Sequence, residues 1–305
     1  MKDSGIGRRL AGALVTIGGL GAVLLTSACG GHGNTRAAIA FQSRDPDLPG
    51  AIFRVYDNGC CRKQLTHPPG VGFFDSAPAW SPDGKRLAFI RVHASGPPHL
   101  YIAGPKGETL VPIRGHEFAG GGLSWSPDGQ KILFSAGDGL RTINLSDGKT
   151  TLIVGRREAG DGAWSPDGRT IALATLDGLY LVDSDGSHRR RLSKVPASLY
   201  DASPAWSPDG KQLAYMQGRT LFFTGFRPRI RVIGAAGGRS RIVTTVASYT
   251  DTNVTWSPDG RRLAFTDFDR SAPGIYTVSA AGGDRRLLVK GITQDVSWSR
   301  PPPQP

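Results

Sequence analysis

The sequence predicts an all-β protein, a six-bladed β-propeller, and two observations support this prediction. All six tryptophans are followed by serine, and five of them open the run Trp-Ser-Pro-Asp-Gly. Spacings of 45, 39, 42, 50 and 42 residues separate them: Trp80, Trp125, Trp164, Trp206, Trp256 and Trp298. A period of about 40 to 45 residues is typical of one four-stranded propeller blade per repeat.

The elements of a blade follow in order within each repeat. A first strand ends at tryptophan and turns at Ser-Pro-Asp-Gly, where proline presets φ, aspartate bonds to nearby backbone and glycine takes the left-handed conformation. An apolar second strand follows, such as residues 87–89, and its unbroken apolar run indicates a sheet covered on both faces. A third strand such as 275–278, a glycine turn such as 282–283 and a more polar fourth strand complete the blade.

The two ends of the chain predict how the ring closes. Trp298 begins a sixth repeat, but the prolines at 301–303 cannot continue a central strand. Three strands without a first strand precede the first tryptophan, at residues 39–41, 52–55 and 62–66. We therefore expect the C-terminal strand to pair with these N-terminal strands as one blade, which removes open sheet edges.

The run Trp-Ser-Pro-Asp-Gly-Lys-Arg-Leu-Ala-Phe-Ile at 80–90, with its four copies, resembles the repeats of the TolB-type (PD40, WD40-like) propeller family. The resemblance covers roughly residues 37–299 and implies a propeller with a scaffolding part in envelope organisation. It implies the fold more specifically than the function, because such blades also occur in peptidases. The chain has no room for the N-terminal α/β domain of TolB, and it lacks the Gly-x-Ser-x-Gly elbow of a hydrolase domain.

The N-terminal segment indicates export and lipid anchoring. A basic start precedes an apolar run at 10–25, which is too short and glycine-rich for a membrane-spanning helix and is typical of a secretory signal. Small residues leading to Cys29 resemble the cleavage site of a bacterial lipoprotein. The alternative is ordinary signal cleavage, which leaves a soluble secreted protein.

We therefore expect an extracytoplasmic protein that a lipidated Cys29 anchors to the bacterial cell membrane. The expected organisation is a lipoprotein signal peptide at 1–28, the lipidated cysteine and a tether at 29–36, the propeller at 37–299 and a proline-rich tail at 300–305.

The charge balance is basic, with 37 Lys and Arg against 25 Asp and Glu, a formal net charge of +12. Many basic residues follow the turns, as at 85–86 and 261–262. Two interpretations stay open: a solvated rim, or attraction to anionic lipid or cell-wall polymer. Nucleic acid is not an expected partner, because an exported chain does not meet it and no groove-reading motif appears.

Cys60 and Cys61 are adjacent in a predicted hairpin. An oxidising compartment favours a vicinal disulfide between them, which would be strained. The alternatives are two free thiols or a labile redox pair.

Five aspartates precede a tryptophan by three or five positions: Asp75, Asp161, Asp201, Asp251 and Asp295. The loops that enter the tryptophan strands surround the mouth of the central channel, where propeller ligands commonly bind. We expect the five carboxylates to ring this mouth. They either cap the strand entrances by accepting hydrogen bonds from backbone N–H groups of the next blade, or form an acidic funnel for a cation or a basic partner segment.

Two further groups of residues are candidate sites. Four histidines, with Glu117 beside the last, share one sector: His67, His93, His99 and His116. Imidazole and carboxylate suit zinc, but the spacing matches no metal motif, so no metal or other cofactor is expected. An insertion at 221–229 holds aromatics beside arginines: Phe222, Phe223, Phe226, Arg227 and Arg229. This composition is typical of interface hot spots, whereas the alternative is that the phenylalanines pack under their own loop.

Together these features predict a monomeric, lipid-anchored propeller that binds another cell-envelope protein or polymer and performs no chemistry. The alternatives are a metal-assisted lyase or hydrolase at the channel mouth, and a sensor of a small ligand. No nucleophile–base pair can be named from the sequence.

Overall fold

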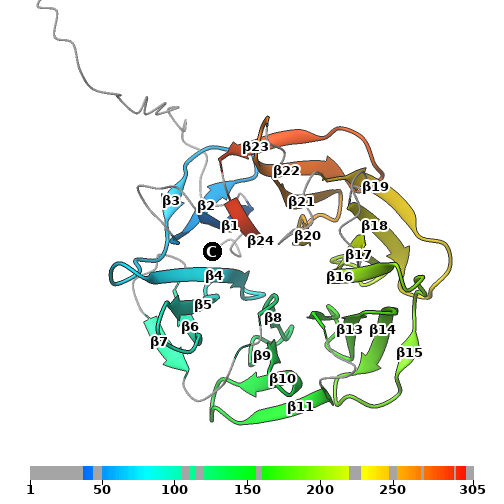
Figure 1. The fold of residues 1–305 in the computed structure, drawn as a ribbon, viewed down its shortest axis with the longest axis horizontal. Coiled ribbons are helices and arrows are strands. Elements are labelled where there is room, and N and C mark those ends of the chain that lie inside the picture. The colour runs from blue at the N-terminus through cyan, green and yellow to red at the C-terminus, as the bar shows by residue number, and fades with distance from the viewer. Residues whose placement is uncertain are drawn as a thin grey trace, which may run out of the picture.

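The computed structural model confirms the six-bladed propeller (Figure 1). Twenty-four strands form six four-stranded antiparallel sheets around a central channel. The structure describes residues 37–43, 50–104, 110–113, 118, 120–155, 160–219, 228–246, 253–268, 271–291 and 293–299. A helix long and apolar enough to cross a membrane does not occur among these residues.

Each blade starts with its tryptophan strand beside the channel and ends with its outermost strand. Blade 1 contains β24 (Thr293–Trp298), β1 (Ala38–Ser43), β2 (Ile52–Tyr56) and β3 (Lys63–Gln64); blade 2 contains β4 (Phe73–Trp80), β5 (Leu87–His93), β6 (His99–Ala103) and β7 (Leu110–Ile113). Blade 3 contains β8 (Ser124–Trp125), β9 (Lys131–Ala136), β10 (Gly139–Asn144) and β11 (Thr150–Gly155); blade 4 contains β12 (Gly162–Trp164), β13 (Thr170–Thr175), β14 (Gly178–Asp183) and β15 (Arg190–Arg191). Blade 5 contains β16 (Leu199–Trp206), β17 (Gln212–Arg219), β18 (Arg229–Gly234) and β19 (Arg241–Thr245); blade 6 contains β20 (Val254–Trp256), β21 (Arg262–Asp267), β22 (Gly274–Ser279) and β23 (Arg286–Lys290).

The ring closes as predicted, because β24 pairs with β1 in blade 1. Just beyond this pair, the Ser299 N–H donates to the Ala38 carbonyl at 2.7 Å, and the Ala38 N–H donates to Ser299 Oγ at 3.0 Å. The hairpin of blade 2 has the same two bonds, between Ser81 and Arg86, at 2.8 and 2.9 Å. The two chain ends therefore reproduce the repeated hairpin without a covalent connection.

The core lies between neighbouring blades. The second strands of five blades contribute their largest fully buried side chains at one equivalent position: Phe41, Phe89, Phe134, Tyr215 and Phe265. Complete burial of a side chain of this kind stabilises the fold by roughly 1.5 to 3 kcal/mol. The tryptophans add a link between blades, as where Trp256 Nε1 donates to the Ala205 carbonyl of blade 5 at 3.0 Å.

Candidate functional site

Two connected cavities occupy the axis of the propeller. A channel cavity of about 420 Å³ is lined by the tryptophan strands of all six blades. A second cavity of about 570 Å³ lies at the mouth, where the chain enters those strands. The two cavities share Ala77, Asp161, Ser203 and Asn253, so these residues form the boundary between mouth and channel.

The residues at this boundary all lie three positions before a tryptophan. The six equivalent residues are Ala77, Gly122, Asp161, Ser203, Asn253 and Asp295. Hydrogen bonds join them from blade to blade, and we call this chain of residues the rim belt.

The rim belt passes through all six blades in sequence. It begins in blade 3, where the Gly122 N–H donates to Asp161 of blade 4. Asp161 Oδ2 also accepts from the N–H and from Oγ of Ser203 in blade 5, both at 3.2 Å. Ser203 Oγ lies 2.9 Å from Asn253 Oδ1 in blade 6, and its single hydrogen serves one of these two acceptors at a time.

The belt then ends in blade 2. Asn253 Nδ2 donates to Asp295 Oδ1 of blade 1 at 2.8 Å, and the Ala77 N–H of blade 2 donates to Asp295 Oδ2 at 2.9 Å. The ring of bonds stays open between Ala77 and Gly122, since neither residue has a polar side chain. Asp161 and Asp295 thus accept from backbone N–H groups of the next blade, as one of the two interpretations of the aspartates predicts.

β-Bulges aim these residues at the axis. The pairing of β4 shifts between Ser76 and Ala79, and that of β16 shifts between Ala202 and Ala205. The bulged residues Ala77, Ser203 and Asp295 have φ values of 51°, 51° and 46°. A bulge re-aims the side chains of a strand, and here it turns the third residue before tryptophan toward the channel.

A glycine makes room for the carboxylate of Asp161. Gly121 has a φ of 86°, and a Cβ added there would lie 2.3 Å from Asp161 Oδ1. Any other residue at this position would displace the carboxylate from the rim belt.

The mouth cavity has two chemically different halves. Blades 4, 5, 6 and 1 supply the polar side chains of the rim belt, and blade 5 also contributes Tyr200, Ala202 and Met216. Blades 2 and 3, where the belt is open, supply mainly apolar side chains: Phe74, Ile90, Val92, Pro98 and Phe118. Phe74 is 39% exposed, so this half offers accessible apolar surface. An acidic half and an apolar half therefore face one cavity.

Asp161 is the half-buried carboxylate of the acidic half. Burial raises its pKa, and its hydrogen bonds from Ser203 and Gly122 lower the pKa less. Within the described part of the chain, no cationic side chain forms an ion pair with it. The carboxylate thus has unused capacity for a cationic partner.

Two of the predicted mouth aspartates lie elsewhere, and the prediction is wrong for them. Asp75 is fully buried, and it accepts from Arg91 Nε at 2.6 Å and Nη2 at 2.7 Å. Asp201 is 3% exposed and accepts from Gln217 Nε2 at 3.0 Å. Both precede a bulge by two residues and lie directly opposite these partners on the neighbouring strand, so they face the blade interior instead of the channel.

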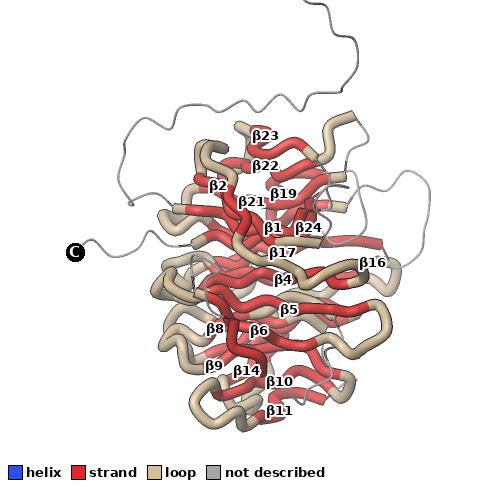
Figure 2. The backbone as a smooth tube through the Cα atoms, turned by 90° about the vertical axis from the view of Figure 1, so that its left-hand side faces the viewer, coloured by secondary structure: helices blue, strands red, loops and turns tan. Residues whose placement is uncertain are grey.

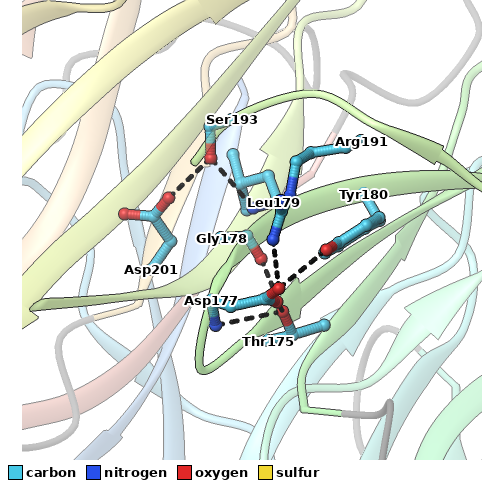
Figure 3. Close-up of polar contacts among 8 residues, drawn as sticks. All are labelled: Thr175, Asp177, Gly178, Leu179, Tyr180, Arg191, Ser193 and Asp201. Atoms are coloured by element: carbon cyan, nitrogen blue, oxygen red, sulfur yellow. Dashed lines mark hydrogen bonds and ion pairs between the residues drawn. The ribbon is translucent and has the colours of Figure 1, made fainter. Parts of the chain in front are cut away.

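Figure 3 shows how Asp201 joins two blades. Ser193, in the loop that leaves blade 4, donates from Oγ to Asp201 Oδ2 at 2.8 Å and accepts from the Leu179 N–H at 2.9 Å. Burial raises the pKa of Asp201, although its hydrogen bonds with Ser193 and Gln217 act in the opposite direction. The fifth aspartate, Asp251, lies outside the described residues.

The candidate histidines do not assemble a metal site in the part of the chain that the structure describes, where no three metal-ligating side chains come together. His67 is exposed, and His93 stacks on Phe73 with ring centroids 4.3 Å apart. His99 begins β6 opposite Arg91. His116 and Glu117 lie outside the described residues.

The insertion is described only at its end. Arg229 begins β18, where it pairs with Gln217 and Thr245. The other candidate contact residues, Phe222, Phe223, Phe226 and Arg227, lie outside the described residues.

The predicted disulfide between Cys60 and Cys61 is not formed. Cys60 is a free thiol, and Cys61 is disulfide-bonded but not to its neighbour. The hairpin is closed without a vicinal bridge, by a main-chain bond and a bond to a side chain. The Tyr56 N–H donates to the Cys60 carbonyl at 3.1 Å, and the Cys60 N–H donates to Asn58 Oδ1 at 3.2 Å.

A surface group of Ser187, His188 and Asp183 has the residue types of a catalytic triad, but its geometry differs. Ser187 Oγ and Asp183 Oδ2 both contact the same imidazole nitrogen, His188 Nδ1, at 3.0 and 2.8 Å. A triad uses the two nitrogens of the ring separately. This group therefore closes an exposed turn.

Ser203 and Asn253 are the site residues that the sequence reasoning missed. Each lies at the same offset from its tryptophan as Asp161 and Asp295. A comparison of all six repeats at that offset, without restriction to aspartate, would have found them.

Comparisons with known proteins agree on the fold. TolB from Acinetobacter baumannii has 21% sequence identity and a TM-score of 0.73, with 88% of this chain and 67% of that chain covered. A chain of the nidogen/laminin complex has 14% identity and a TM-score of 0.65, with 86% and 98% covered. An oligogalacturonate lyase in complex with manganese has 16% identity and a TM-score of 0.54, with 79% and 70% covered.

At these identities the likenesses show a shared fold. No curated protein sequence matches the chain significantly. The family model described as "PD40: TolB beta propeller domain" matches residues 140–302, which is more than half of the sequence. The chain therefore belongs to the TolB β-propeller (PD40) family.

Proposed function

We propose that this chain is a lipid-anchored, extracytoplasmic propeller that binds another cell-envelope protein or an envelope polymer at its channel mouth and performs no chemistry there. The observation that carries the proposal is the divided mouth cavity. Its acidic half holds Asp161 and Asp295, and its apolar half holds side chains such as Phe74 and Ile90.

This division suits a partner segment with a basic group beside an apolar group. The carboxylates would accept hydrogen bonds from a lysine or arginine, and such charge-assisted bonds are stronger than neutral ones. An aliphatic or aromatic side chain would fill the apolar half. The cavity of about 570 Å³ is within the range of about 300 to 1,000 Å³ that is usual for ligand pockets.

The rim belt favours recognition because it is preorganised. Ser203, Asn253 and the two carboxylates already hold one another in position. Fixed polar groups lose little conformational entropy on binding, which increases affinity. The propeller of the nidogen/laminin complex is an example of this fold in a protein assembly.

Chemical crosslinking in cells, followed by capture of the protein and mass spectrometry, tests the proposal. The Asp161→Asn/Asp295→Asn double variant should lose an envelope partner that the wild type captures, with a small change in melting temperature. Asp201→Asn is the matched control, because this aspartate does not line the mouth. It should retain the partner. Equal capture by the wild type and the double variant would contradict the proposal.

The lipid anchor has its own test. The proposed organisation keeps the signal peptide at 1–28, the lipidated Cys29 with its tether at 29–36, the propeller at 37–299 and the tail at 300–305. Mass spectrometry of the mature N-terminal peptide should show a diacylglyceryl-modified Cys29, and Cys29→Ser should release the protein from membranes.

A further inference from the structure

The described chain enters the propeller on the face opposite the mouth. The five Ser-Pro-Asp-Gly turns lie at the ends of the tryptophan strands that point away from the mouth, and we call this side the turn face. Ala38 bonds to Ser299 as Arg86 bonds to Ser81 in a turn, so Ala38 lies on the turn face. Figure 2 shows the ring edge on, with loops gathered at its two faces.

The turn face presents exposed basic side chains in a repeated pattern. In four of the five turns, the residue after Asp-Gly is basic and exposed: Lys85, Arg169, Lys211 and Arg261. Among the described residues, no carboxylate lies within ion-pair distance of these four, although each of them interacts electrostatically with the aspartate of its own turn. Two further exposed arginines extend the basic surface: Arg190, which begins β15 in blade 4, and Arg239, in the outer turn of blade 5.

The aspartates of the same turns are held within the turn. In the first turn, Asp83 Oδ1 accepts from Ser81 Oγ at 2.5 Å and from the Lys85 N–H at 3.0 Å. The other four turns repeat both bonds. These carboxylates are exposed as well, but two hydrogen bonds hold each of them within its turn, whereas the basic side chains beside them extend freely into solvent.

We propose that the turn face rests on an anionic lipid bilayer, with the mouth directed away from the membrane. The proposal rests on the lipid anchor of the proposed function and adds an orientation to it. Because the propeller begins on the turn face, a short N-terminal tether brings this face to the bilayer first. Seven residues, 30–36, span at most about 25 Å.

The energetics support contact with anionic headgroups. Each lysine or arginine near an anionic surface strengthens binding by about fivefold at moderate salt. Three such side chains acting together therefore change binding by about a hundredfold. The orientation also leaves the mouth open to an envelope partner.

Lysine labelling tests the orientation. The mature protein would be placed on vesicles of phosphatidylcholine alone or with about one-third phosphatidylglycerol, and treated with an amine-reactive reagent. Labelling of Lys85 and Lys211 should fall several-fold on the anionic vesicles. Lys194 and Lys290, which are exposed at the mouth side, should label equally on both. Protection of the mouth lysines, or no protection of either pair, would overturn the proposal.

Charge variants test the same surface without relying on the anchor. Lys85→Gln/Lys211→Gln/Arg261→Gln should weaken sedimentation of the unlipidated mature protein with anionic vesicles by about a hundredfold. Lys194→Gln/Lys290→Gln is the control, and it should bind like the wild type.

Vesicle binding by the turn face can be distinguished from lipid anchoring at Cys29 and from partner binding at the mouth. Binding of the unlipidated protein to anionic vesicles would support the basic surface whether or not Cys29 carries a lipid in cells. Binding to an anionic cell-wall polymer but not to vesicles would overturn the membrane assignment.

Discussion

Two pairs of aspartates lie near the start of tryptophan strands, one pair five residues and the other pair three residues before the tryptophan. The two pairs serve different regions of the molecule. Asp75 and Asp201 are buried opposite side chains of their own blade, namely Arg91 and Gln217. Asp161 and Asp295 line the mouth and bond to the next blade. The first pair stabilises individual sheets, whereas the second couples blades around the channel.

A bulge separates the two regions. In β4 and β16 the extra residues fall between the buried aspartate and the tryptophan, and they interrupt the alternation of side chains. The bulged residues adopt the left-handed backbone conformation, which residues other than glycine, asparagine and aspartate seldom adopt. The backbone conformation at one position of the strand therefore decides whether a carboxylate is buried in its blade or accessible at the mouth.

The largest effect is expected at the buried pair in blade 2. Arg91→Met removes both bonds to Asp75 and leaves a buried carboxylate without a cation, which costs about 3 to 5 kcal/mol. Arg91→Gln copies the partner that Asp201 has in blade 5, so it should cost less. Thermal and urea unfolding measure both variants. Equal losses would show that packing against Phe89 and Tyr101, and not the carboxylate, dominates at Arg91.

A smaller effect is expected at the rim belt. Ser203→Ala removes the hydroxyl that contacts Asp161 and Asn253, and it should lower the free energy of unfolding by about 1 to 2 kcal/mol. Ser76→Ala is the control, because Ser76 Oγ makes one long contact of 3.5 Å with the Ile90 carbonyl. Urea unfolding compares the two variants. A loss from Ser203→Ala no larger than the control would mean that the belt does not couple the blades.

The sequence predicted the ring and its closure because the determinants are local and repeated. The Trp-Ser-Pro-Asp-Gly turn fixes each hairpin. The three N-terminal strands lack the first strand of a blade, and the C-terminal strand supplies it. The site was predicted in part. Asp161 and Asp295 lie at the mouth, but Asp75 and Asp201 do not, because a bulge has no clear signature in a single sequence. Ala77 shows this, since alanine does not mark a left-handed position.

The vicinal disulfide was mispredicted for a related reason. Adjacency of Cys60 and Cys61 says nothing about the conformation of the peptide between them. Cys61 has a φ of 59°, and main-chain bonds close the turn around the free Cys60 thiol.

The two regions should also differ in how stability depends on pH. Burial raises the pKa of Asp161 above its ordinary value of 3.8, so the folded state binds the proton more tightly than the unfolded state. Lowering the pH from 7 through the raised pKa should therefore stabilise the wild type relative to Asp161→Asn, which resembles the protonated side chain.

Asp167, in one of the turns, is the control, because its pKa is shifted in the opposite direction to that of Asp161. The hydrogen bond from Ser165 is the largest cause that lowers its pKa, so its stabilising effect is lost as the pH falls below 3.8. The wild type should lose stability relative to Asp167→Asn over that range. Melting temperatures between pH 3 and 7 measure both differences, and the same sign for both variants would contradict the assignment of Asp161.

The smallest effect is expected where the rim belt is open. Ala77 has the same φ of 51° as Ser203, so Ala77→Ser introduces a hydroxyl at an equivalent bulge without a new backbone demand. The hydroxyl has no belt side chain to meet on the blade 3 side, because Gly122 occupies that position. Stability should therefore stay within about 0.5 kcal/mol of the wild type, as for most substitutions that break no contact.

Partner capture by Ala77→Ser should respond more, since the hydroxyl places a polar group at the edge of the apolar half. Weaker capture at unchanged melting temperature would locate recognition in the gap of the belt, whereas unchanged capture would restrict it to the carboxylates.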